Sequence, residues 1–169
     1  MIWLWRDEMR NEQEVNQALT TYSDIVRKIC IVHLKNYHDS EDVFQDVFVK
    51  YLLSDKDFEN DDHEKAWIIR VTINACKDKI KNFFRKKVDS LDDLFIEPLD
   101  ISSENKELIE VILSLPEKYR IVIYLFYYEG YSAIEISKIL QKKENTIYTW
   151  LARAREQLKE KLGGDFFEE

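Results

Sequence analysis

The side chains best suited to chemistry in this sequence are basic residues that recur at helical spacing in two segments. In the first, residues 66–85, one side of a predicted helix carries Arg70, Asn74, Lys77 and Lys81. The other side is an apolar stripe made of Ile69, Ile73, Cys76, Ile80 and Phe83. Cations can hold phosphates, and an asparagine can hydrogen-bond to a base edge. The helix therefore suits nucleic acid, with an ordinary solvated Lys/Arg face as the alternative.

The second segment, residues 128–162, has the pattern of a helix-turn-helix. Gly130 suits the left-handed end of one helix, and Ser132 with Glu135 forms a capping box that starts the next. A helical apolar stripe then follows at Ile147, Leu151, Ala154, Leu158 and Leu162. It leaves Tyr148, Thr149 and Arg153 pointing outward, where they could enter a DNA groove. The alternative is a solvated helix of a bundle.

Other kinds of site fail on residue type or spacing. Taken as a calcium loop, the acidic stretch from Asp55 has Asn60 in place of glycine and Ala66 in place of the last glutamate. Cys30 and Cys76 are far apart, and the three histidines lack metal-binding spacing. Neither a GxSxG motif nor a phosphate-binding glycine loop occurs. We therefore expect no metal, cofactor, small-molecule substrate or catalytic residue.

The elements that position these faces are predicted to be helices. The chain has 169 residues, 45% of them hydrophobic, with 3 glycines and 2 prolines, which favours an all-α protein. Further helices are predicted over residues 12–37, from Asp39 to Leu52, over 104–113, and from Pro116 to Gly130 with Ser114 as a possible cap. Residues 53–65 are too charged for a core element. No apolar run suits a signal peptide or a bilayer span, and a cytoplasmic setting is consistent with the two cysteines.

Charge is strongly segregated along the chain, whose net charge is −8. Residues 39–64 hold ten acidic side chains against two lysines, whereas residues 65–87 hold eight basic side chains against Asp78. Residues 88–103 hold five acidic and no basic side chains, and residues 138–161 hold seven basic against three acidic. Pro98 and the acidic composition predict a flexible linker over 88–103 between two small helical bundles. Two cationic helices in an acidic chain fit a protein that contacts DNA twice and binds something else besides.

In their order and separation, these segments resemble a bacterial RNA polymerase sigma factor of the extracytoplasmic-function (ECF, sigma-70 group 4) type. Residues 40–48 (SEDVFQDVF) and 66–74 (AWIIRVTIN), with Asp78, are similar to region 2 of that family. Residues 115–120, the turn at 127–130 and residues 146–155 are similar to region 4. The resemblance implies a region 2 domain over residues 1–87, the linker 88–103, a region 4 helix-turn-helix domain over 104–163, and a tail at 164–169.

The resemblance also implies partners and their residues. Core RNA polymerase would bind through its β′ clamp at Asp42, Gln45 and Asp46, and through its β flap at Tyr119 and Arg120. A base flipped out of the −10 element of promoter DNA would be captured in a pocket formed by loop 58–65, with Asn74 behind it. The residues that bind the −10 element would be Asn60, Asp61, Asp62, Arg70, Asn74, Lys77, Asp78 and Lys81. The −35 element would be bound by Lys143, Glu144, Asn145, Thr146, Tyr148, Thr149, Arg153 and Arg155. An anti-sigma factor is a further implied partner. Trp67 is expected to be a core anchor rather than a base-stacking wedge.

Two other interpretations stay open at this point. One is a transcription regulator whose C-terminal helix-turn-helix acts alone as a dimer. The other is a structural or adaptor protein without DNA contact. Under the regulator interpretation the acidic face at Asp42 and the cationic helix over 66–85 would be accidental. Association with core polymerase separates the regulator from the sigma factor, and polymerase-dependent initiation tests the adaptor.

Overall fold

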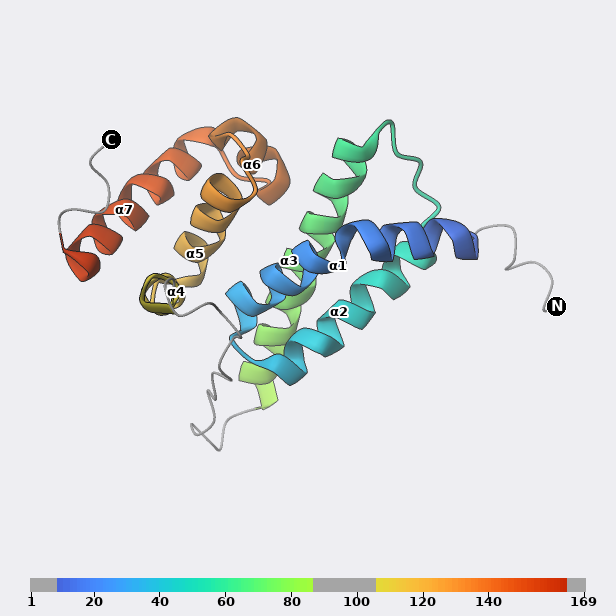
Figure 1. Cartoon of the computed structure of the whole chain (residues 1–169), viewed down its shortest axis with the longest axis horizontal. Coiled ribbons are helices and arrows are strands. Elements are labelled where there is room, and N and C mark those ends of the chain that lie inside the picture. The colour runs from blue at the N-terminus through green and yellow to red at the C-terminus, as the bar shows by residue number, and fades with distance from the viewer. Residues whose placement is uncertain (1–8, 87–105, 164–169) are drawn as a thin grey trace. The chain divides into compact units, whose positions relative to one another are not determined.

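The computed structural model describes residues 9–86 and 106–163, and every regular element within them is a helix (Figure 1). The chain divides into two compact units, Met1–Phe95 and Ile96–Glu169. The predicted all-α class with two helical bundles is therefore confirmed. The predicted linker, the predicted boundaries beside it and the tail 164–169 lie outside the described residues. None of the described helices combines the length and apolar character that a bilayer span needs.

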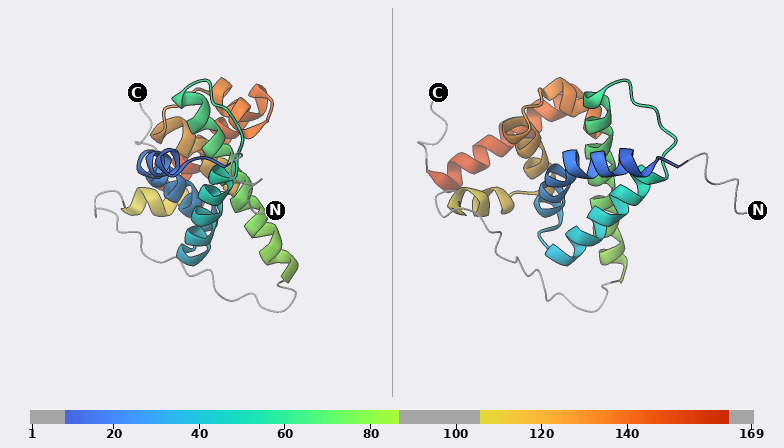
Figure 2. Two further views of the ribbon diagram at one scale, coloured as in Figure 1. Left: turned by 90° about the vertical axis from the view of Figure 1, so that its right-hand side faces the viewer. Right: turned by 45° about the vertical axis from the view of Figure 1, so that its right-hand side comes forward.

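The N-terminal unit is a bundle of three helices, α1 (Glu12–Leu34), α2 (Tyr37–Leu52) and α3 (Asp61–Lys86), each of which packs on the other two (Figure 2). A capping box between Asn11 and Glu14 starts α1. The core is formed by fully buried aliphatic side chains from all three helices, among them Val26, Ile29, Val47, Ile68 and Ile69. Burial of one apolar face per helix leaves the opposite faces to solvent.

Two helix starts lie earlier than the sequence predicts. The helix α2 begins at Tyr37 rather than Asp39, because the side chain of Asn36 accepts a hydrogen bond from the Asp39 amide at 2.9 Å. The helix α3 begins at Asp61, so the second half of the predicted loop 58–65 is helical. Asn60 accepts a hydrogen bond from the His63 amide at 2.9 Å, and acidic side chains at 61, 62 and 64 favour the positive end of the helix dipole. The acidic residues that predict a loop before residue 66 therefore include the first turn of α3.

The C-terminal unit contains α4 (Lys106–Leu113), α5 (Glu117–Ile123), the π-helical turn η2 (Tyr124–Tyr128), α6 (Ala133–Leu140) and α7 (Glu144–Leu162). The helix α7 packs on α4, α5 and α6. Gly130 adopts the left-handed φ of 73°, and Ser132 and Glu135 form the predicted capping box. Four of the five predicted stripe residues of α7 are buried, and Leu162 is half-buried. The helix-turn-helix prediction is thus confirmed.

Three local details differ from the prediction in this unit. Ser114 does not cap α5, because its hydroxyl donates to the Val111 carbonyl at 2.7 Å and Pro116 takes the N-cap position. The helix that leads to Gly130 ends in the wider η2 turn, which leaves Tyr127 47% and Tyr128 57% exposed. The helix α7 begins at Glu144, three residues before Ile147, where its predicted apolar stripe starts, so residues 144–146 belong to its first turn.

We predict that Ser132→Ala lowers the local stability of α6 by about 1 kcal/mol, because the capping box satisfies backbone donors at the helix start. Amide hydrogen exchange along α6 measures this change. Thr149→Ala is the matched control in the same unit, since its exposed hydroxyl donates only to the carbonyl one turn back in the described contacts. The control is expected to change stability by less than about 0.5 kcal/mol. Equal effects of the two substitutions would contradict the capping role.

Candidate functional site

The cationic side of α3 faces solvent in the described structure. Asn74, Asp78 and Lys81 are exposed, and Arg70 and Lys77 are half-buried. On the opposite side Ile69, Ile73 and Cys76 are buried, as predicted. The stripe prediction is wrong at its end: Ile80 is half-buried and Phe83 is 42% exposed. The helix α3 has 26 residues and α2 has 16, so the last turns of α3 extend beyond α2 and their side chains are less buried.

The predicted polymerase-docking residues Asp42, Gln45 and Asp46 are all exposed on α2. Val49, one turn further, is 51% exposed. We call these four residues the α2 acidic face. Helical spacing places them on one side, and the buried residues Val43 and Val47 hold the other side against the core.

Asp42 is not a free carboxylate. Its oxygen accepts a hydrogen bond from the Lys79 ammonium at 2.8 Å, and the same ammonium lies 3.3 Å from Asp39. The hydrogen bond from Lys79 holds the pKa of Asp42 below its ordinary value. The bridge joins α2 to α3 across the surface, and with Asp42 65% exposed it contributes little to stability.

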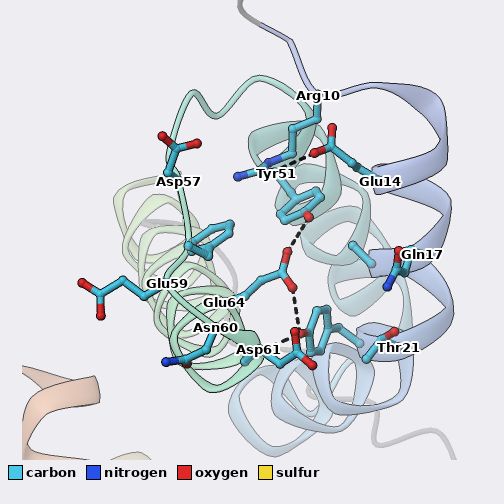
Figure 3. A pocket seen from close by; sticks show the side chains of 13 residues that line it. Arg10, Glu14, Gln17, Thr21, Tyr51, Asp57, Glu59, Asn60, Asp61 and Glu64 are labelled. Atoms are coloured by element: carbon cyan, nitrogen blue, oxygen red, sulfur yellow. Dashed lines mark hydrogen bonds and ion pairs between the residues drawn. The ribbon is translucent and has the colours of Figure 1, made fainter.

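A cavity of about 610 Å³ opens between α1, the end of α2 and the loop that leads into α3 (Figure 3). Its lining includes the predicted Asn60 and Asp61, but neither Asp62 nor Asn74. Five carboxylates line it together with one arginine, Arg10; they are Glu14, Asp57, Glu59, Asp61 and Glu64. A phosphate backbone would be repelled there. The structure therefore does not bring the loop residues and Asn74 together in this cavity.

Glu64 joins all three helices of the N-terminal unit. Its carboxylate accepts a hydrogen bond from Tyr22 of α1 at 2.9 Å and another from Tyr51 of α2 (Figure 3). Burial, followed by the bond to Glu64, raises the pKa of both tyrosines above the ordinary value. The charged composition of residues 53–65 predicts Glu64 to be part of a solvated loop, which is wrong for this residue. Two tyrosines within apolar stripes were the available signal, because a buried tyrosine hydroxyl needs a partner.

Trp67 belongs to an aromatic cluster at the start of α3. Its ring centroid lies 5.5 Å from that of Phe58 and 6.2 Å from that of Tyr51. Its side chain is half-buried. Packing against the loop and α2 agrees with the expected anchoring role rather than with an exposed wedge.

Most of the residues predicted for the −35 element lie exposed at the start of α7. Lys143, Glu144, Asn145, Tyr148, Thr149 and Arg153 are exposed, and Thr146 is half-buried. Arg155 differs from this group. Its Nε donates to the Tyr127 hydroxyl at 2.7 Å and its guanidinium lies 5.5 Å from the centre of the Phe126 ring. This arginine ties α7 to η2.

Tyr119 and Arg120 do not form the predicted partner surface. They are 5% and 6% exposed, and the guanidinium of Arg120 donates to the carbonyls of Leu113 and Leu115 at 3.2 Å and 3.0 Å. Burial lowers the pKa of Arg120. The helix α5 turns this side toward the interior of its unit, where Arg120 fixes the connection from α4. The expectation of a contact through these side chains is therefore corrected.

Each of the two units matches a known protein family. Residues 18–86 match the family described as Sigma-70 region 2, and residues 105–158 match Sigma-70, region 4. The chain is 30% identical over 161 residues to the ECF RNA polymerase sigma factor SigW of Bacillus subtilis, which covers 83% of this chain and 84% of that protein. It is 27% identical over 141 residues to the RNA polymerase sigma factor SigV of the same organism, covering 81% and 84%.

Two solved structures share the fold. One is the sigma factor RpoE in complex with the anti-sigma factor NepR from Bartonella quintana, with a TM-score of 0.76, 22% identity, and coverage of 90% of this chain and 99% of that one. The other is CnrH in complex with the cytosolic domain of CnrY, with a TM-score of 0.66, 22% identity, and coverage of 92% and 91%. At this identity the likeness concerns the fold.

We predict that the burial of Tyr22 and Tyr51, together with their hydrogen bonds to Glu64, makes the N-terminal unit sensitive to alkali. The pKa values of Tyr22 and Tyr51 are raised above 10.0, so the folded chain keeps protons that the unfolded chain releases. This stabilisation is present below the unfolded pKa and is lost as pH rises past it. Tyr22→Phe and Tyr51→Phe should each reduce the fall in unfolding free energy between about pH 8 and pH 11, measured by urea unfolding.

Tyr37→Phe is the control for this prediction, because Tyr37 is 52% exposed on α2. Its alkaline profile should match that of the wild type. Identical profiles for all three variants would show that Tyr22 and Tyr51 do not set the alkaline limit.

Proposed function

We propose a residue-level route to promoter opening for this chain, which belongs to the ECF RNA polymerase sigma factors. As such a factor it directs RNA polymerase to promoters and supports transcription initiation. The observation that carries the proposal is the pairing of a buried stripe with an exposed cationic face on α3, together with an outward-facing α7 in the second unit. Each unit thus offers one helix to DNA.

For the −10 element we propose that Asn74 hydrogen-bonds to a base while Arg70, Lys77 and Lys81 hold the neighbouring phosphates. A capped, 26-residue helix keeps these side chains at fixed spacing. The start of α3, with Asn60, Asp61 and Asp62, would border the captured base, and Asp78 would limit how the strand lies. The acidic cavity on the α1 side is unsuited to the strand, so the proposed path runs over the α3 face.

For the −35 element we propose that α7 enters the major groove by its N-terminal turns. Lys143, Glu144, Asn145 and Thr146 lie at the start of α7. In the turns that follow, Tyr148, Thr149 and Arg153 are exposed and face outward. No side-chain hydrogen bond caps the start of α7 in the described structure, and the positive end of the helix dipole suits a phosphate. Arg155 is proposed to brace α7 on η2, so that its contribution to DNA is indirect.

For core polymerase we propose docking of the β′ clamp on the α2 acidic face. Carboxylates beside the exposed Val49 give both charge complementarity and an apolar contact. In the C-terminal unit we propose that the β flap contacts the exposed Tyr127 and Tyr128 of η2, because Tyr119 and Arg120 are buried.

The proposal also covers how the chain is regulated, where it works and whether it catalyses a reaction. Both structural relatives are held by an anti-sigma factor or by a cytosolic domain of a second protein. We propose that an anti-sigma factor also binds this chain, that the chain works in the cytoplasm beside core polymerase, and that it breaks no bond itself.

The test is run-off transcription with purified core polymerase on a library of promoter fragments. Initiation that depends on both the chain and the polymerase supports the proposal. Failure to form a stoichiometric complex with core polymerase would favour a regulator that acts alone. A stable complex without initiation on any fragment would favour an adaptor.

We predict that Asp42→Lys combined with Asp46→Lys lowers affinity for core polymerase by about 100-fold or more, because charge reversal repels a basic docking surface. Affinity is measured by fluorescence titration of the labelled chain. The control is Glu12→Lys with Asp24→Lys, which makes the same charge change on exposed positions of α1. Unchanged affinity in the α2 variant would refute the assignment.

We also predict that Asn74→Ala lowers promoter opening about tenfold, since one base contact is removed. Binding to core polymerase should change by less than about twofold, because Asn74 lies apart from the α2 acidic face. Permanganate footprinting measures opening. Asn82→Ala, an exposed asparagine on the same helix, is the control and should leave opening intact. Equal losses of opening and of binding by Asn74→Ala would count against the proposed role.

A further inference from the structure

Arg10 connects the start of α1 to the end of α2 and to the loop between α2 and α3. Its backbone amide donates to the Leu52 carbonyl at 3.0 Å. Its guanidinium donates to the carbonyl of Lys56 in the loop and lies 3.9 Å from Glu14. With a side chain only 13% exposed, this arginine is held inside the structure rather than on a solvated surface.

The same guanidinium covers two aromatic rings that come from different elements. It lies 4.5 Å from the centre of the Tyr51 ring and 4.8 Å from that of Phe58. The two rings are parallel within 3°, with centroids 6.3 Å apart. A flat cation over ring faces is a favourable and directional contact, and lysine reproduces its geometry poorly. Arg10 therefore fixes Phe58 relative to the last turn of α2.

Besides Arg10, the loop is held from outside by the Phe58 ring, which packs against the rings of Tyr51, His63 and Trp67. Its remaining described hydrogen bonds, such as Glu59 to His63 and Lys56 to Ser54, join residues at most four apart in sequence. Arg10 is also the single cation among the described residues that line the adjacent cavity, against five carboxylates. Removing it would leave these carboxylates to repel one another. Both geometry and charge thus make the loop position depend on Arg10.

We infer that Arg10 is a positioning residue for promoter opening: it holds the α2–α3 loop, and with it Asn60 at the start of α3, in the arrangement that selects −10 bases. The inference rests on the proposed function, because it assumes that this loop borders the captured base. Arg10 itself touches no DNA. Its loss should therefore reduce base selectivity without removing a DNA contact.

The test uses the full chain, core polymerase and a promoter fragment that the wild-type holoenzyme selects from a library, with single-base variants of its −10 element. The measured quantity is the ratio of open complex on the selected promoter to that on each variant. Arg10→Met should lower this ratio about tenfold, with faster amide exchange at residues 54–60. Arg10→Lys, which keeps the charge but not the planar group, should lower it about threefold. Binding to core polymerase should change less than about twofold in both.

Arg27→Met is the matched control. Arg27 lies within α1, whereas Arg10 directly precedes the N-cap of that helix. Arg27 lies 4.3 Å from the centre of the Phe44 ring and pairs with Glu41 at 3.3 Å, so it faces α2 instead of the loop. Its selectivity ratio should equal that of the wild type. An unchanged ratio in Arg10→Met overturns the inference, whereas a parallel loss of polymerase binding would indicate that this variant does not fold. If Arg10→Met does not fold, the ratio for Arg10→Lys decides. A wild-type chain that starts no transcription would instead overturn the proposed function.

Discussion

The hydrogen bonds of Glu64 to Tyr22 and Tyr51 fix the structure on which the rest of the N-terminal unit depends. They bring the first turn of α3 against both α1 and α2, at the point where the loop ends. The start of α3 determines which side of that helix is buried ten residues later. Asn74 lies ten residues after Glu64 in the same helix, and it is exposed on the side opposite the buried Ile69, Ile73 and Cys76.

One-sided burial also explains how an acidic chain can present cations to DNA. Acidic side chains gather on α2, the loop and the first turn of α3, where they cap a helix or face solvent. Basic side chains occupy the outward faces of α3 and α7. The net charge of −8 is thus an average over surfaces of opposite sign. Net charge alone misjudges such a protein because binding depends on the local field.

Roles carried over by position hold only where the side chain reaches the surface. Asp42, Gln45 and Asp46 are exposed, whereas Tyr119 and Arg120 are buried and Arg155 is bound to Tyr127. Tyr119 and Arg120 lie in α5, before η2, and Arg155 lies in α7. Their contacts follow from how these elements pack within the unit, which a match by position in the sequence does not show.

The sequence by itself determined the all-α class, the helix-turn-helix with its Gly130 end and Ser132 cap, the buried stripe of α7, and that of α3 as far as Cys76. These depend on local propensity, capping and periodicity, which act within a few residues of the chain. Only the tertiary structure decided the contacts of Glu64 and Arg10, the bridge from Lys79 to Asp42, and the burial of Arg120. Glu64 with Tyr22 and Tyr51, Arg10 with Lys56, and Lys79 with Asp42 are pairs that lie 13 to 46 positions apart. Arg120 is enclosed by the packing of its whole unit. Periodicity shows which face of a helix is apolar, but the partner that covers a polar group depends on how the helices pack.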